Sequence, residues 1–200
     1  MSMKKRVLFL LGTGFEEIET VTPIDLLRRA DAEVIVASVS GEQFVTGRSQ
    51  ITLRADAGLA DVAEQEFDLL VVPGGPGVKA LRADGRPAKL AKAFHTSGKM
   101  VAAICAGPTV LKDAELLNGR RFTAHFSVYE ELPEALADQR VVRDEAILTS
   151  RGAGTAVDFG LALVEALFGA EKSNEIARAI MARSLDLPGS IPGLTLRRLA

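Results

Sequence analysis

The sequence of 200 residues has no tryptophan, one tyrosine, two histidines and a single cysteine, Cys105. One cysteine permits no intrachain disulfide and no thiolate cluster of the kind that holds structural zinc. Lysine plus arginine (24) nearly balances aspartate plus glutamate (26), and no basic run occurs, so sequence-specific nucleic-acid binding is not expected. Apolar runs are too short to cross a bilayer, and the basic start of the chain lacks a signal-peptide pattern. We therefore expect a cytoplasmic protein that does not contact membranes.

The residues that are present, 48% hydrophobic and 25% charged, are typical of a globular domain. Short, almost wholly apolar runs alternate with longer stretches rich in alanine, leucine, arginine and glutamate. The predicted strands are Arg6–Leu11, Glu33–Val39, Phe67–Val72, Met100–Ile104 and Ala146–Thr149. The predicted helices are Glu16–Ala30, Arg86–Ser97, Gly107–Asp113, Thr155–Phe168 and Ser173–Arg183.

This alternation predicts an α/β fold in which a mostly parallel sheet is covered on both faces by helices. Pro23 is expected to kink the first helix. Val45–Leu53 and Arg120–Val142 interrupt the rhythm and are expected to add small β pieces and a peripheral helix. We predict a single domain over residues 1–184 and a C-terminal tail, with two Pro-Gly pairs, over residues 185–200.

Cys105 is the strongest candidate for chemistry, because it lies at the turn between a predicted strand and a predicted helix. Ligands of open α/β sheets bind outside the carboxyl ends of the strands, which is where this turn would lie. Such a turn resembles a nucleophile elbow, and nearby amides and the helix start would favour the thiolate. We therefore expect a thiol pKa well below the ordinary value. The alternative interpretation is a small buried hydrophobic residue.

Three acids follow the first predicted strand, at the start of the first helix. Helical geometry places Glu16 and Glu19 on one face and Glu17 off it, so either of the first two is a candidate partner for the thiolate. In a poorly solvated pocket such an acid would be protonated and would donate a hydrogen bond. Solvated acids that stabilise the helix dipole are the alternative. His125 follows the short predicted strand Arg121–Ala124 and is a candidate base or orienting group, or a structural residue.

Four motifs, in order along the chain, resemble the ThiJ/PfpI superfamily, most closely the branch of the Parkinson-associated deglycase and its bacterial chaperone relative. The motifs are Gly14–Val21 continued by Pro23–Arg29, Val72–Gly75, Ala102–Thr109 and Leu148–Thr155. The resemblance runs from about Lys5 to about Ala179 and implies a flavodoxin-like three-layer sandwich that forms a homodimer. It also implies a set of site residues: Cys105, Glu19 and His125 in the pocket, oxyanion-binding amides of Gly75 and Ala106, and Arg48 near the dimer interface.

Two departures from related branches bear on activity. Ala106, not histidine, follows Cys105, and Phe126 follows His125, so peptidase and amidotransferase activities are disfavoured. The resemblance then implies a cofactor-independent glyoxalase or deglycase. Cys105 would form a hemithioacetal with methylglyoxal or glyoxal, free or as early adducts with protein or nucleotide amines, and Glu19 would act as general acid/base. The alternative is a redox-sensing stress chaperone regulated by oxidation of Cys105.

Overall fold

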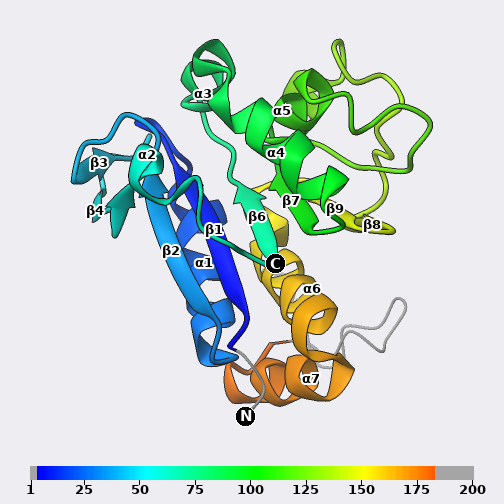
Figure 1. The fold of residues 1–200 in the computed structure, drawn as a ribbon. Helices are drawn as coiled ribbons and strands as arrows, with labels where there is room; N and C mark the ends of the chain where they lie inside the picture. The colour runs from blue at the N-terminus through cyan, green and yellow to red at the C-terminus, as the bar shows by residue number, and fades with distance from the viewer. Residues whose placement is uncertain (1–3, 183–200) are drawn as a thin grey trace, which may run out of the picture.

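A computed structural model, described here for residues 4–182, has a central seven-stranded sheet between two layers of helices (Figure 1). The strand order is β5-β2-β1-β6-β7-β9-β8, and every pairing is parallel except that of β8 with β9. The strands of this sheet are β1 (Arg6–Leu11), β2 (Glu33–Ser38), β5 (Ala57–Gly58), β6 (Leu69–Val72), β7 (Met100–Ile104), β8 (Val141–Asp144) and β9 (Ile147–Ser150). A separate hairpin pairs β3 (Phe44–Thr46) with β4 (Thr52–Arg54).

The helices divide between the two faces of the sheet. One face carries α1 (Glu17–Arg29), α6 (Ala156–Phe168) and α7 (Ala170–Ala179), and α1 packs on α6. The other face carries α2 (Leu59–Val62), α3 (Val78–Asp84), α4 (Arg86–Thr96) and α5 (Pro108–Asp113). The predicted mostly parallel α/β sandwich is therefore confirmed. No helix among residues 4–182 has both the length and the apolar character needed to cross a bilayer.

Strand β1 shows why apolar runs without alternation predict a central strand. Every residue from Val7 to Leu11 is fully buried. Val7, Phe9 and Leu11 pack into the core under α1 and α6, whereas Leu8 and Leu10 pack into the core under the other helical layer. Because side chains alternate between the faces of a sheet, a strand covered on both sides needs apolar residues at every position.

The structure corrects the prediction for the segment between α5 and β8. Arg121–Ala124 forms no strand, and the expected peripheral helix is only a 3-10 turn, η1 (Phe126–Val128). The segment is held by buried side chains such as Leu132 and by hydrogen bonds to other loops. Helix α7 begins at Ala170 and ends at Ala179, not at Ser173 and Arg183. The predicted tail, 185–200, lies outside the described residues.

The strand order places four loops at one edge of the sheet. These loops follow β1, β6, β7 and β9, whose carboxyl ends point the same way. β6 lies between β1 and β7, so the strand that precedes the acids is not adjacent to the strand that precedes Cys105. Any contact between them must pass over the loop that follows β6, and the side chains of this loop decide whether the two can meet.

The packing of α6 on α1 yields the first prediction. A Cβ on Gly160 would lie 2.6 Å from Leu26 Cδ1 and 3.2 Å from Pro23 Cα. The leucine tip can move, but the backbone at Pro23 cannot move without shifting α1. We expect Gly160→Val to lower the free energy of unfolding by ~1–3 kcal/mol, the cost of overpacking a core. Glu165→Val, an exposed site on the same helix, is the control for the β-branched side chain. Equal losses in urea denaturation would contradict the packing argument.

Candidate active site

Cys105 occupies a strained turn that joins β7 to α5. Its φ is +65°, in the left-handed region that few residues other than glycine adopt. The Cys105 N–H donates to Ser150 O at 2.9 Å, and Cys105 O accepts from the N–H of His125 at 2.9 Å. Such strain persists only where the surroundings hold the backbone in place, and it is concentrated at functional sites. The turn leaves the cysteine side chain half-buried.

The three acids at the start of α1 have three different environments. Glu16 caps the helix, and its carboxylate accepts the N–H of Glu19 at 2.8 Å. Glu19 is 1% exposed and faces Cys105, and both acids line the same cavity. Glu17 points the other way, where its carboxylate accepts the N–H of Ser49 at 2.7 Å. The structure thus brings Glu19, the acid that the resemblance implies, next to the cysteine.

Two glycines allow these groups to meet over β6. A Cβ on Gly74 would lie 2.6 Å from Cys105 Cβ and would overlap a carboxylate oxygen of Glu19. A Cβ on Gly152, in the loop after β9, would lie 3.3 Å from His125 Cδ2, 3.6 Å from Glu19 Oε1 and 3.9 Å from Cys105 Sγ. The side chains of Cys105, Glu19 and His125 therefore surround one small space, and a side chain at position 152 would fill it.

His125 is held as a neutral hydrogen-bond donor. Its Nδ1 accepts the N–H of Ser127 at 3.3 Å and lies 2.8 Å from the Ser127 hydroxyl. An Nδ1 that accepts from an amide carries no proton, so in the neutral ring the proton is on Nε2. Burial lowers the pKa of His125, and the charges of Arg151 and Arg48 lower it further. This environment suits a donor better than a base.

A cavity of about 660 Å³ opens over these groups. Cys105, Glu16, Glu19 and His125 lie at one part of its lining, together with Gly75 and Ala106. Arg48 also lines the cavity, on the turn of the β3–β4 hairpin, where its N–H donates to Phe15 O at 2.9 Å. Among residues 4–182, no three side chains of the types that bind metals are grouped so that they could hold an ion.

The pKa values of Glu19 and Cys105 depend on each other. Burial raises the pKa of Glu19 to about 7, and the charge of Glu16 adds to the rise. Burial and then the Glu19 carboxylate raise the pKa of the Cys105 thiol to about 12, against amides of Gly75 and Ala106 that lower it. The expected low thiol pKa is therefore wrong while Glu19 is ionised, because it left out burial and the neighbouring charge. The pair holds one proton between about pH 7 and about pH 12.

Sequence reasoning missed residues that act through shape or through a hydrogen bond to the backbone. Gly74 and Gly152 were visible only as parts of glycine-containing loops, without the close approach that requires them. Thr109 also lines the cavity, and its hydroxyl donates to Ala106 O at 2.7 Å. Nothing in the sequence pattern separates this threonine from an ordinary residue of a first helical turn.

Comparisons with known proteins agree with this architecture. The pattern that defines the DJ-1/PfpI family matches residues 5–166. The crystal structure of Drosophila melanogaster DJ-1beta superposes with a TM-score of 0.86 at 34% identity and covers 91% of this chain and 100% of that one. A Caenorhabditis elegans protein named glutathione-independent glyoxalase DJR-1.2 is 35% identical over 90% of this chain and 98% of its own. A Bacillus subtilis protein named putative cysteine protease YraA is 38% identical over 74% of this chain and 90% of its own.

The raised pKa of Glu19 has a consequence for stability. An acid whose pKa rises from 4.5 to about 7 on folding binds more protons in the folded state, so folding is weakened as the pH rises through this window. We expect Glu19→Gln to remove this loss and to be more stable than the parent at pH 8, by up to ~3 kcal/mol. At pH 4.5 the two proteins are expected to be about equally stable. Urea denaturation at both pH values tests this, and a difference that does not change with pH would contradict it.

Proposed function

The chain belongs to the DJ-1/PfpI family, and on that premise we propose that it is a cofactor-independent glyoxalase. Its substrates would be methylglyoxal or glyoxal, free or as early amine adducts, and its products hydroxy acids. The observation that carries this proposal is that the Glu19 carboxyl group and the Cys105 sulfur face each other across Gly152 in the lining of one cavity. A relative named as a glutathione-independent glyoxalase supports it.

The surroundings of Glu19 support the placement of the shared proton on the carboxyl group. Its Oε2 is buried and has no hydrogen-bond partner of good geometry among the described residues, and although the amides of Gly74 and Ala153 lower the pKa of the carboxyl group, burial raises it more. An ionised oxygen left in this way is costly, whereas a protonated oxygen needs one acceptor. The Cys105 sulfur is the acceptor at hand. Protonation of Glu19 also removes the charge that raises the thiol pKa, so the thiolate and the protonated acid stabilise each other.

The proposed reaction begins with attack of the Cys105 thiolate on the aldehyde carbon. The new C–S bond displaces the carbonyl electron pair onto oxygen, and Glu19 gives that oxygen its proton, which yields a hemithioacetal. The Gly75 and Ala106 amides, which lie against the sulfur, would hold the developing oxyanion. His125 would donate from Nε2 to the second carbonyl oxygen.

The second half of the reaction uses Glu19 as a base. The Glu19 carboxylate takes the hydrogen of the hemithioacetal carbon as a proton, and the electron pair of the broken C–H bond forms the C=C bond of an enediolate, with the negative charge on the second carbonyl oxygen. The hydroxyl proton of the former aldehyde oxygen then moves to this second oxygen. Return of the proton to the neighbouring carbon gives a thioester of the hydroxy acid. Water then hydrolyses the thioester, which frees the thiol and releases lactate from methylglyoxal or glycolate from glyoxal. The sum is addition of one water, without a redox partner.

Peptide hydrolysis fits this site less well, although a relative is named as a putative cysteine protease. Expulsion of an amine requires a proton donor of the imidazolium type next to the nucleophile. His125 lines the cavity, but burial and two arginines favour its neutral form. His95, the other histidine, lies within 3.4 Å of Arg120, away from the cavity.

Redox sensing by Cys105 is the alternative function, and it would use the same two side chains. A thiolate open to the cavity attacks a peroxide to give a sulfenate and water, and a protonated Glu19 would donate to the new oxygen. A stress chaperone regulated in this way requires the sulfur but not proton transfer between carbon atoms. This difference separates the two functions experimentally.

We expect the rate of turnover to depend on the protonation state of the pair formed by Glu19 and Cys105. With methylglyoxal, kcat/KM should rise with pH to a plateau above about pH 7, where the pair has lost its first proton. Glu19→Gln should lower lactate formation by ~100-fold or more, because the amide cannot transfer the proton. Glu17→Gln is the matched control, since Glu17 is a buried acid on the same helix that points away from Cys105.

Three outcomes decide between the functions. Loss of turnover in Glu19→Gln with intact protection of a heated client protein supports the enzyme and separates it from chaperone action. Equal loss of both activities, or no dicarbonyl turnover by the parent, contradicts the glyoxalase proposal. A Glu17→Gln variant as inactive as Glu19→Gln would contradict the specific role of Glu19.

A homodimer is part of the proposal, and exposed apolar residues support it. Ile18 and Val21 on α1 and Phe44 and Ile51 on the hairpin are 44–60% exposed. The bond between Glu17 and Ser49 ties the hairpin to α1, so these residues belong to connected elements, with Arg48 on the same hairpin turn. We call these four residues the apolar patch. Apolar surface of this kind marks protein–protein contacts.

The oligomeric state tests this assignment. We expect the parent to sediment as a dimer and Phe44→Asp to shift it toward the monomer, because a buried charge would be placed in the interface. Phe126→Asp, which replaces another exposed phenylalanine outside the apolar patch, is the control. A monomeric parent, or dissociation by the control alone, would contradict the assignment of the interface.

A further inference from the structure

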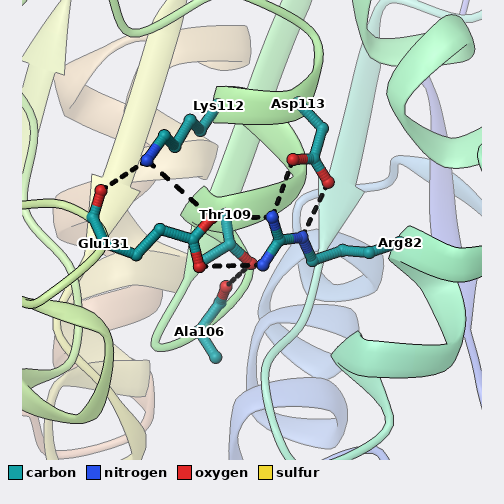
Figure 2. Close-up of polar contacts among 6 residues, drawn as sticks. All are labelled: Arg82, Ala106, Thr109, Lys112, Asp113 and Glu131. Carbon is teal, nitrogen blue, oxygen red and sulfur yellow. Dashed lines mark hydrogen bonds and ion pairs between the residues drawn. The ribbon is translucent and has the colours of Figure 1, made fainter.

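Thr109 makes two hydrogen bonds to one carbonyl oxygen beside the nucleophile. Its side-chain hydroxyl donates to Ala106 O at 2.7 Å, and its N–H donates to the same oxygen at 3.1 Å (Figure 2). Thr109 is the second residue of α5, lines the cavity and is 1% exposed. The backbone N–H alone would already satisfy this carbonyl, so the hydroxyl bond is an additional constraint and not a requirement for burial.

The hydrogen bond from the Thr109 hydroxyl holds Ala106, the residue whose own N–H faces the Cys105 sulfur. The peptide before Ala106 is held at Cys105 O by the N–H of His125, and the peptide after it is held at Ala106 O by Thr109. With both flanking peptide planes fixed, Ala106 has little freedom to turn its own N–H away from Cys105 Sγ. This amide is one of two that lower the thiol pKa against burial.

The strain at Cys105 explains why an additional constraint is needed. A non-glycine residue with φ near +65° is strained, and the turn would release this strain by relaxing if its contacts allowed. Relaxation would rotate the same peptide that carries the Ala106 N–H. Contacts on both sides of the turn therefore keep the sulfur and its amide donors in one arrangement.

Helix α5 is a fixed support for Thr109, because ion pairs anchor its other end. Arg82 on α3 donates from Nε to Asp113 at 2.7 Å and from its NH2 group to Glu131 at 2.6 Å (Figure 2). Lys112 donates to Glu131 O at 2.6 Å. These contacts tie α5 to α3 and to the segment that follows His125. The Thr109 hydroxyl thus projects from the first turn of a helix whose last turn is anchored by these contacts.

We propose that Thr109 is a positioning residue for the reaction at Cys105: its hydroxyl holds the Ala106 carbonyl and so keeps the Ala106 amide directed at the sulfur and at the developing oxyanion. Thr109 itself need not touch the substrate. The part of this inference that concerns turnover rests on the proposed glyoxalase function. The part that concerns the reactivity of the sulfur does not, because alkylation of Cys105 measures it directly.

The test compares two substitutions at position 109 with a matched control elsewhere. Thr109→Val removes the hydroxyl and keeps the shape, and Thr109→Ser restores a hydroxyl. Ser173→Ala is the control, because the buried Ser173 hydroxyl donates to Leu161 O at 2.9 Å, between α7 and α6 and away from the cavity. The measurements are the pH dependence of Cys105 alkylation by iodoacetamide, kcat and KM for methylglyoxal, and the free energy of unfolding.

Thr109→Val is expected to lower kcat by roughly 10- to 100-fold with KM changed less than ~2-fold, since a misdirected donor affects the transition state more than binding. Its alkylation profile should shift to higher pH. Thr109→Ser should recover most of both properties, and Ser173→Ala should lose stability without either change.

The inference is overturned if Thr109→Val keeps the parent's alkylation profile, if Thr109→Ser does not recover it, or if Ser173→Ala changes it equally. A parent without dicarbonyl turnover would reject the glyoxalase proposal alone. The alkylation profiles would still decide the role of Thr109.

Discussion

The site depends on one proton shared by a buried carboxyl group and a half-buried thiol. Both Glu19 and the Cys105 thiol lose stability as ions when they are buried, and each ion repels the other. The free-energy cost of burying these ions falls only if one group keeps its proton while the other, ionised group accepts hydrogen bonds. The amides of Gly75 and Ala106 are those donors for the sulfur, so the backbone of two loops determines which of the two groups can be charged.

The fold creates this environment mainly with backbone groups brought together at one edge of the sheet, and not with a large number of reactive side chains. The loops after β6, β7 and β9 contribute the nucleophile and the glycines that let the groups approach, the first turn of α1 contributes the acid, and the segment between α5 and β8 contributes the histidine. The glycines matter because they have no side chain. A single methyl group at position 74 would separate Glu19 from Cys105.

The sequence predicted the architecture because a sheet covered on both faces demands apolar residues at every strand position, and β1 and β7 meet that demand. It also identified Cys105 and the two acids that share a helical face. The sequence did not predict how the Glu19 carboxyl group lies relative to the Cys105 sulfur. The first and fourth predicted strands are not neighbours, because β6 lies between them, and Glu19 meets Cys105 only where Gly74 after β6 leaves room for both. Burial reversed the expected thiol pKa, and the contribution of Thr109 needs coordinates because a hydroxyl bond to a carbonyl leaves no mark on periodicity or composition.

Helix α1 carries Glu19 on its inward side and part of the apolar patch, Ile18 and Val21, on its outward side. Only 13 residues long, it cannot turn or slide to suit one side without displacing the other. In the proposed dimer, contact between subunits and proton transfer would thus be mechanically coupled through this one helix. A substitution on the outer surface of this helix that improved the fit between such subunits would preserve activity only if it left the Glu19 carboxyl group in register with the Cys105 sulfur.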